Sequence, residues 1–502
     1  MNTQEITTGP LKVKSATLIL GLALVAGLAF DWLVRHDPPG LGFVLFSSLV
    51  VVSAVVVRRP RRKETYLLLA ASWSLACWTM IRAADFLVAI DICAAILLLS
   101  AAASSEVYTD RIWLLRIRSH ISSWFSQLGA LCVGAVRPVA ALIHERTNLQ
   151  IGRAAPFLRG VLFATPVFAL FAVLLASADA VFSNFLGDVI PDWDITIGST
   201  AAHVIWIAAI GWIAAGFYVW TAQPEKQPGP EARGSLRIGY VETMSVLGSV
   251  AALFGLFVIF QIEYLFGGVA ELPGVTYAEY ARSGFFQLLA VATLTAGLIW
   301  LALEVSGDQL EGRRLTAFRA VCIAMILLTG VILLSALKRL GLYEQVFGFT
   351  RLRLLSHLFT FLVAGALALL AVQLFQRSRP LFLAGTVALG FCVLTVLNSI
   401  NPDAYIAARN IDRAQNGKLA SLGYIDELSA DAVPTVIDRY RRSAIYPRLG
   451  VEIDQWSCLA TATERSWRGW NLGHSRAVAA RQDAGLDKTR PRWMQWQQIC
   501  DT

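Results

Sequence analysis

Charged side chains are scarce in this sequence. Lysine, arginine, aspartate and glutamate make up 16% of its 502 residues, whereas 56% are hydrophobic. A soluble protein needs a largely charged surface, so this composition excludes that class and indicates an integral membrane protein. The net charge of +8 suits basic loops that meet anionic lipid. The sequence has no basic stripe with interleaved aromatic residues, so it gives no indication of nucleic-acid binding.

Motifs for familiar chemistry are lacking as well. No GxSxG, HExxH, P-loop or GxGxxG segment stands in a context that supports hydrolase, protease or nucleotide chemistry. The six histidines are scattered, and no cysteine pair has metal-ligand spacing, so we expect no metal and no cofactor. His203 and His357 are interpreted as packing or head-group contacts. Five cysteines in or near apolar runs are interpreted as packing residues: Cys77, Cys93, Cys132, Cys322 and Cys392.

Long apolar runs are what the sequence has instead. About eleven are long enough to cross a hydrocarbon core about 30 Å thick, which predicts an all-α polytopic bundle. The tail after residue 400 is polar enough to leave the membrane as a small helical cap. The runs are 15–34, 41–57, 66–84, 86–104, 158–181, 201–221, 242–266, 283–304, 318–337, 353–375 and 381–400.

The first apolar run could be mistaken for a secretory signal, because Lys12 and Lys14 precede it. It is as long as a span, however, and passes into Asp31 and Trp32 without a small-residue cleavage site. We therefore expect an uncleaved first helix.

The basic residues between the runs predict the orientation. Residues 58–63 hold four arginines and a lysine, so this loop is expected in the cytoplasm. Counting outward places the N-terminus inside and the tail outside. The other loops predicted inside are 105–157, 222–241, 305–317 and 376–380.

The loop 105–157 needs separate treatment. Phe125 to Glu145 is apolar enough to suggest a span, but Arg137 and Pro138 would lie at its centre, where both are costly. We interpret this segment as interfacial or partly re-entrant, and the amphipathic segment 111–124 as a helix on the inner leaflet. The expected domains are a membrane half at 1–221, a Pro/Gly-rich linker at 222–241, a second half at 242–400 and a tail at 401–502.

Polar residues gather at the predicted outer ends of the second-half runs. Glu263 still lies inside its apolar run, and Arg351 and Arg353 stand in a first helical turn, where the helix dipole disfavours cations. We expect these ends to form one outward-facing polar pocket. The alternatives are an interfacial belt of tyrosine and arginine and, for Glu279, a capping box with Thr276. The candidate binding residues are Gln261, Glu263, Tyr264, Tyr277, Glu279, Arg282, Lys338, Arg339, Tyr343, Arg351, Arg353, Asn398, Asn401 and Arg409.

Two further groups are predicted to be structural. Arg82, Asp85 and Asp91 lie where the third and fourth runs meet, and we interpret them as an ion pair that holds this corner, with a functional site as the alternative. Cys458 and Cys500 share the tail, which is expected to lie outside the cytoplasm. We expect them to form a disulfide.

Several phrases resemble a bacterial multi-pass membrane family, domain of unknown function 4173, which is related to the 4153 type. They are TYAEYARSGFFQLLAV at 276–291, LYEQVFGFTRLRL at 342–354, NPDAYIAARNI at 401–411, SADAVF at 177–182 and LSADAVP at 428–434. The resemblance covers roughly residues 160–440. It implies the membrane architecture and no catalytic residue.

Three function classes stay open from the sequence. The first is binding or translocation of an anionic or lipid-like substrate at the outward-facing pocket. The second is a membrane sensor or scaffold that signals through its extracytoplasmic tail. A membrane-embedded transferase is the third, because an acid and several arginines could serve a phosphorylated substrate, although no motif requires it.

Overall fold

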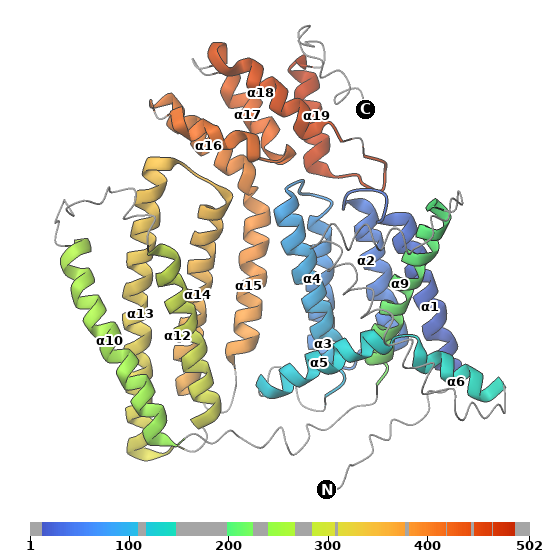
Figure 1. The fold of residues 1–502 in the computed structure, drawn as a ribbon, viewed down its shortest axis with the longest axis horizontal. Coiled ribbons are helices and arrows are strands. Elements are labelled where there is room, and N and C mark those ends of the chain that lie inside the picture. Colours follow the sequence, from blue (N-terminus) through green and yellow to red (C-terminus); the bar gives the residue numbers. More distant parts are fainter. Residues whose placement is uncertain are drawn as a thin grey trace, which may run out of the picture.

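The computed structural model describes residues 13–108, 117–146, 198–223, 239–266, 284–306, 310–376, 381–417, 419–442, 446–463 and 465–486. Within these ranges the regular structure is helical and contains no strand. Figure 1 shows a row of roughly parallel helices with a smaller group of helices across one end. The predicted all-α bundle with a small helical tail is confirmed.

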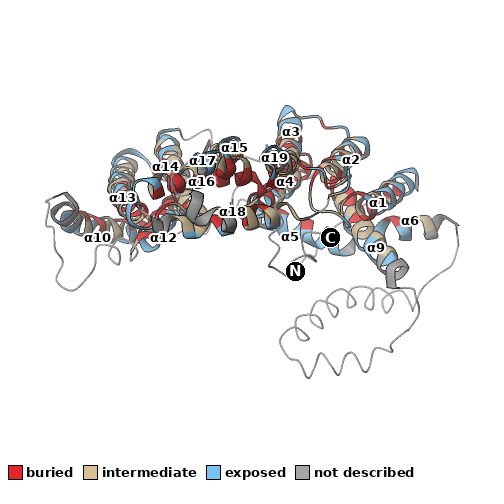
Figure 2. Cartoon of the chain, turned by 90° about the horizontal axis from the view of Figure 1, so that it is seen from above, coloured by how far each residue is buried: buried red, intermediate tan, exposed pale blue. Residues whose placement is uncertain are grey.

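The first membrane half is a set of helices that stand side by side in both views (Figures 1 and 2). The first of these helices packs most extensively against the last, with Ile19, Ala23 and Tyr218 buried between them. The five helices are α1 (Val13–Leu33), α2 (Leu41–Val57), α3 (Lys63–Trp78), α4 (Asp85–Ser105) and α9 (Gly198–Thr221).

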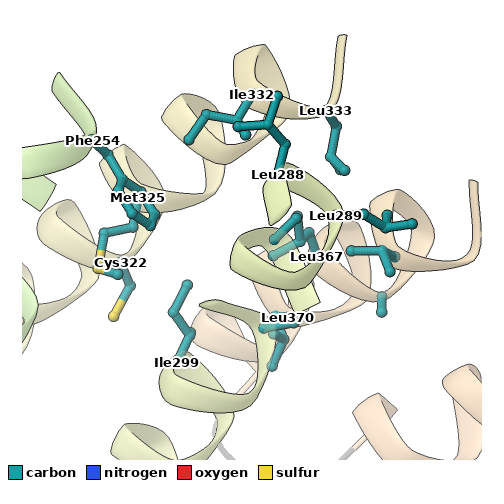
Figure 3. Packing of buried hydrophobic residues seen from close by; sticks show 14 of the residues in the cluster. Phe254, Leu288, Leu289, Ile299, Cys322, Met325, Ile332, Leu333, Leu367 and Leu370 are labelled. Atoms are coloured by element: carbon teal, nitrogen blue, oxygen red, sulfur yellow. The ribbon is translucent and has the colours of Figure 1, made fainter. Parts of the chain in front are cut away.

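The second half contains the largest hydrophobic core. Its helices are α10 (Tyr240–Phe266), α12 (Phe285–Ser306), α13 (Gly312–Phe347), α14 (Arg351–Phe375) and α15 (Leu381–Ile400). Figure 3 shows side chains of the first four meeting in one cluster, among them the fully buried Met325, Ile299 and Leu370. Helix α15 differs, because Leu394 and Leu397 belong to the cluster of α3 and α4. It therefore joins the two halves.

Eight described helices are long and apolar enough to cross a membrane: residues 14–33, 85–105, 203–221, 240–260, 285–305, 312–347, 351–375 and 382–400. The run 41–57 forms a shorter apolar helix of 17 residues. The predicted span 66–84 extends too far, since α3 ends at Trp78. The chain turns there, and Asn471 of the tail donates a hydrogen bond to the Thr79 carbonyl. The run 158–181 lies outside the described residues. The count of eleven spans therefore stays a prediction.

Two helices lie across the others rather than along them. Helices α5 (Ile117–Val133) and α6 (Val136–Arg146) run transversely at the end of the bundle opposite the tail (Figure 1). Gly134, with a φ of 27°, separates them. The basic loop 58–62 lies at this same end, where the Glu106 carboxylate accepts hydrogen bonds from the N–H groups of Arg61 and Arg62 at 3.1 Å each. That this end faces the cytoplasm stays a prediction.

The tail folds into a helical domain that we call the cap, residues 402–486. Its buried core includes Ile406, Ile411, Val433, Val436 and Trp456. The cap contains α16 (Pro402–Gln415), η4 (Leu419–Glu427), η5 (Ala430–Ala432), α17 (Val433–Arg441), α18 (Tyr446–Thr461) and α19 (Leu472–Asp483). It covers the ends of helices from both membrane halves (Figure 1).

Candidate functional site

Part of the predicted pocket cannot be placed. Tyr277, Glu279 and Arg282 lie outside the described residues, and Gln261, Glu263 and Tyr264 lie outside the residues whose side chains the structure describes. The pocket as a whole stays a prediction. The remaining candidates lie on α13, at helix ends beneath the cap or, in the case of Arg409, in the cap itself.

Arg351 is held by the cap. Its guanidinium donates two hydrogen bonds to the Asp403 carboxylate, Nε to Oδ1 at 2.8 Å and Nη2 to Oδ2 at 2.6 Å. Asp403 is fully buried in the first turn of α16, where the helix dipole favours an anion, and it also accepts from the Ser429 N–H at 2.9 Å. A face of the guanidinium lies over the Phe86 ring, with Cζ 4.9 Å from the ring centroid. The carboxylate that offsets this first-turn cation therefore comes from the chain itself.

The corner between α3 and α4 differs from its prediction. Arg82 and Asp91 do not pair with each other; Arg82 donates to the carbonyl oxygens of Asn398 at 2.6 Å and Ser399 at 3.3 Å, and Asp91 accepts from Asn398 Nδ2 at 2.8 Å. The last carbonyls of a helix lack intrahelical donors and carry negative partial charge, which explains why they attract the guanidinium. Asp85 is exposed at the start of α4. These contacts tie α15 to the first membrane half.

Asp431 of the cap lies against the start of α4. Its Oδ2 accepts hydrogen bonds from the N–H groups of Ala83 at 2.7 Å and Ala84 at 3.1 Å. Burial raises the pKa of this carboxyl to about 6, against the opposing effects of these two N–H groups and of the Arg82 charge. Gly473 leaves room for it, because a Cβ there would lie 2.0 Å from Oδ1. A largely buried carboxyl group thus supplies acceptors that the helix start lacks.

Asn471 holds the other side of the same turn. Its Nδ2 donates to the carbonyl oxygens of Thr79 at 2.9 Å and Arg82 at 2.7 Å, while its Oδ1 caps α19. The Leu472 N–H donates to the Met80 carbonyl at 2.8 Å. The α3–α4 turn and the cap are therefore hydrogen-bonded through both backbone and side chains.

The cap also contacts the α1–α2 loop. The Leu41 N–H donates to the Trp470 carbonyl at 3.0 Å, and Arg468 Nε lies 3.0 Å from Asp37 Oδ2. On the second half, Asn410 donates to and accepts from the Phe349 backbone at 2.9 and 2.8 Å. Connections of both halves are thus bound to one domain.

The other predicted candidates within the described residues have the following contacts. Arg353 stacks on Tyr343 at 4.3 Å from its ring centroid, and the exposed Arg409 stacks on Tyr405. Asn401 caps α16 and donates to the Asp431 carbonyl at 3.2 Å. On α13, Lys338 is exposed and Arg339 is buried.

Both histidines that were interpreted as packing or head-group contacts face carboxylates. His357 Nε2 lies 3.1 Å from Glu344 Oε2, and His203 Nδ1 lies 2.5 Å from Asp31 Oδ2. Neither carboxylate was singled out from the sequence. Each belongs to a different helix from its histidine, so no local spacing indicates the contact.

Sequence reasoning also missed Asp403, Asp431 and Asn471. The first two lie within the phrases NPDAYIAARNI and LSADAVP, which were used for the family resemblance alone. An acidic residue in a polar tail is usually solvated. One signal in the sequence was available: Asp403 and Asp431 each stand two residues after a helix N-cap, Asn401 and Ser429.

Cys458 is disulfide-bonded in the structure. Its expected partner, Cys500, lies outside the described residues, so the pairing stays a prediction. The five cysteines of the apolar runs are free.

An apolar cavity of about 320 Å³ lies between α4, α5 and α15, at the junction of the two membrane halves. Leu98, Trp124, Gly390 and Phe391 line it, together with Ser104 and Ser123. Its size and lining suit a hydrocarbon chain.

Comparison with known proteins yields one match. A family model described as a domain of unknown function, DUF4153, matches residues 69–439. The match shows that the chain is of the 4153 type. It does not show the 4173 designation that the sequence phrases suggested. No curated protein and no solved structure matches the chain. The matched range includes Asp403 and Asp431 but not Asn471.

We predict that Asp403→Asn loosens the cap. Removing one partner of a buried, hydrogen-bonded pair typically costs several kcal/mol, and we expect about 2 to 4 kcal/mol here because Arg351 retains some solvent contact. The thermal midpoint of the purified protein should fall. Asp412→Asn is the matched control: its partner Arg439 is about half exposed, so its effect should stay below about 1 kcal/mol. Equal midpoints for the two variants would contradict the prediction.

We also predict that Asp431 makes cap docking stronger in mild acid. Its folded pKa is raised from 3.8 to about 6, so the folded state binds the proton more tightly than the unfolded state. The protonated carboxyl therefore contributes up to about 3 kcal/mol to the free energy of unfolding. This contribution is fully present below about pH 4 and is lost as the pH rises through about 6. Charged groups that act on Asp431 are Arg82, Asp403 and Arg465.

Asp431→Asn tests this pH dependence. The amide cannot ionise, so this variant should lose much less stability between pH 5 and pH 7.5 than the wild type. Denaturant or thermal unfolding of the cap at both pH values is the measurement. Asp438→Asn, at an exposed position paired with Arg442, should keep the wild-type slope. If the stability of Asp431→Asn changes with pH as much as that of the wild type, the Asp431 carboxyl is not the cause of the pH dependence.

Proposed function

Because the chain belongs to the family described as a domain of unknown function, DUF4153, a description that names no activity, we propose a function from its geometry. The protein is a membrane sensor or scaffold whose cap reports its state to the membrane helices. The proposal includes a bacterial inner-membrane location with the N-terminus in the cytoplasm and the cap outside. The basic residues of loop 58–62, at the end opposite the cap, support this orientation.

One observation carries this proposal: a single domain is hydrogen-bonded to connections of both membrane halves. Arg351–Asp403 joins it to the second half, and the contacts of Asp431 and Asn471 join it to the first. A ligand or partner that prefers one arrangement of the cap must therefore also shift the helix ends that the cap holds. Among the described residues, α15 and the start of α14 make the hydrophobic contact between the membrane helices of the two halves, against α3 and α4.

The same contacts weigh against an open anion site at the described residues. Arg351 already has a bidentate carboxylate, Asn398 is buried against Asp91, and Asn401 caps a helix. An external anion would have to displace these partners. The described residues likewise add no support for a transferase.

A second candidate function is the binding or translocation of a lipid-like substrate, and the apolar cavity favours it. The cavity lies at membrane depth between the two halves, where an acyl chain could enter from the bilayer. In this version the outward-facing polar groups would contact the head group.

Hydrogen–deuterium exchange of the full chain in nanodiscs tests the sensor proposal. Asp403→Asn should raise exchange in the cap and, by several-fold, in peptides covering 58–62 and 104–108 at the opposite end of the bundle. Asp431→Asn at pH 7.5 should lower exchange in the same peptides, because it removes a buried charge. Asp412→Asn should change neither region. Changes confined to the cap in both test variants would show a passive cover instead of a sensor.

The lipid-like candidate predicts that Gly390→Phe empties the cavity of lipid. Gly390 lines the cavity, and a Cβ there meets nothing within 4 Å, so the ring has room to fill it. Native mass spectrometry should show at least about tenfold less co-purified lipid than in the wild type. Gly248→Phe, at a second helical glycine with open space, should retain it. Equal lipid occupancy in both variants would contradict this candidate.

A further inference from the structure

Three potential metal ligands meet at the cap-side end of the first membrane half. Asp31 lies in the last turn of α1, His36 in the loop that follows, and His203 near the start of α9. Their ligand atoms all lie within 4.8 Å of one another. Asp31 and His203 are 172 positions apart in the chain, so the sequence pattern predicted no metal site here.

The packing of α1 on α9 brings these ligands together. Gly27 allows the close approach, because a Cβ there would lie 2.4 Å from the Ile207 carbonyl oxygen. On the next turns, the rings of His36 and His203 have centroids 5.1 Å apart. Two of the three ligands, Asp31 and His203, therefore stand on a closely packed helix pair, and His36 comes from the loop that follows α1.

The ligand set suits a divalent transition cation. Two imidazoles and one carboxylate are a common three-ligand set for Zn²⁺, with bonds of roughly 2.0 to 2.2 Å. Because the three atoms lie within 4.8 Å of one another, one point lies within about 2.8 Å of each. His203 Nδ1 and Asp31 Oδ2, which are 2.5 Å apart, would separate by about 1 Å to bind the same tetrahedral ion.

The carboxylate is already oriented for this role. Arg35 Nη1 donates to Asp31 Oδ1 at 2.8 Å, which leaves Oδ2 facing His203. Such a contact to the second oxygen fixes a metal-binding carboxylate in place. Asp31 is buried, whereas His36 is exposed and the His203 side chain is 40% exposed, so a cation can reach the site from the protein surface.

We propose that Asp31, His36 and His203 bind a divalent transition cation of the Zn²⁺ class, with a fourth position open to water. The site is independent of the sensor proposal but lies beside one of its contacts, since Asp37 follows His36 and pairs with Arg468 of the cap. Bound metal ties α1 to α9 at the place where the cap meets the first half.

A Zn²⁺ titration of the full-length protein tests the site. The protein is purified in detergent without a polyhistidine tag, stripped with a chelator, and titrated at pH 7.5 in competition with a fluorescent chelator. The wild type should bind one equivalent at this site, and the metal should raise its thermal midpoint. His36→Gln and His203→Gln should each weaken binding at least about tenfold and abolish the midpoint shift.

His357→Gln is the matched control, because His357 pairs with Glu344 far from the three ligands in the chain and should leave Zn²⁺ affinity unchanged. His36 is exposed and makes no hydrogen bond among the described residues, so its substitution should not impair folding. If the wild type binds no more Zn²⁺ than the His36→Gln/His203→Gln double variant, the cluster is an ion pair of Asp31 and His203 only, and the proposal is overturned.

Discussion

Helix ends that leave a membrane must find partners for their backbone groups, and the cap supplies many of them here. The N–H groups before α4 donate to Asp431, and the carbonyls of the α3–α4 turn accept from Asn471. Asn410 satisfies the Phe349 backbone in the same way between α13 and α14. The groups around the α3–α4 turn are buried, so losing a partner would leave them unpaired at a cost in stability. The position of the cap follows from this requirement.

The same requirement explains cations that the charge pattern left unexplained. Arg351 stands in a first helical turn at the predicted outer face, and Asp403 offsets its charge. Arg82 donates to the last carbonyls of α15, where the dipole favours a positive charge. These side chains connect the cap, α14 and α15 to the first half. The charges of Arg351 and Arg82 are therefore paired with groups of the chain itself. The sensor proposal depends on these pairs, because they connect the cap and the two membrane halves.

Two features lie beside this network and are not used by it. The cavity between α4, α5 and α15 is lined mainly by apolar side chains. The Asp31, His36 and His203 cluster is polar and reaches the protein surface, where His36 is exposed. Both lie at junctions, one between the membrane halves and one between α1 and α9. A ligand at either place would bias the same helix packing that the cap holds at the other ends.

The sequence by itself determined the helical membrane class, most helix positions and the separate helical tail, because apolar runs of span length and a polar tail are local properties. It also singled out Arg351 and Asp91 as unusual, since a cation in a first helical turn and a carboxylate at membrane depth are costly whatever their partners. Only the tertiary structure decided what those residues contact. Asp403 lies 52 positions from Arg351 and Asp431 lies 348 from Ala83, and no periodicity reports pairs at such separations. The pairing of Arg82 with α15 instead of Asp91 was settled by helix packing, which brings the α15 carbonyls within reach of the guanidinium.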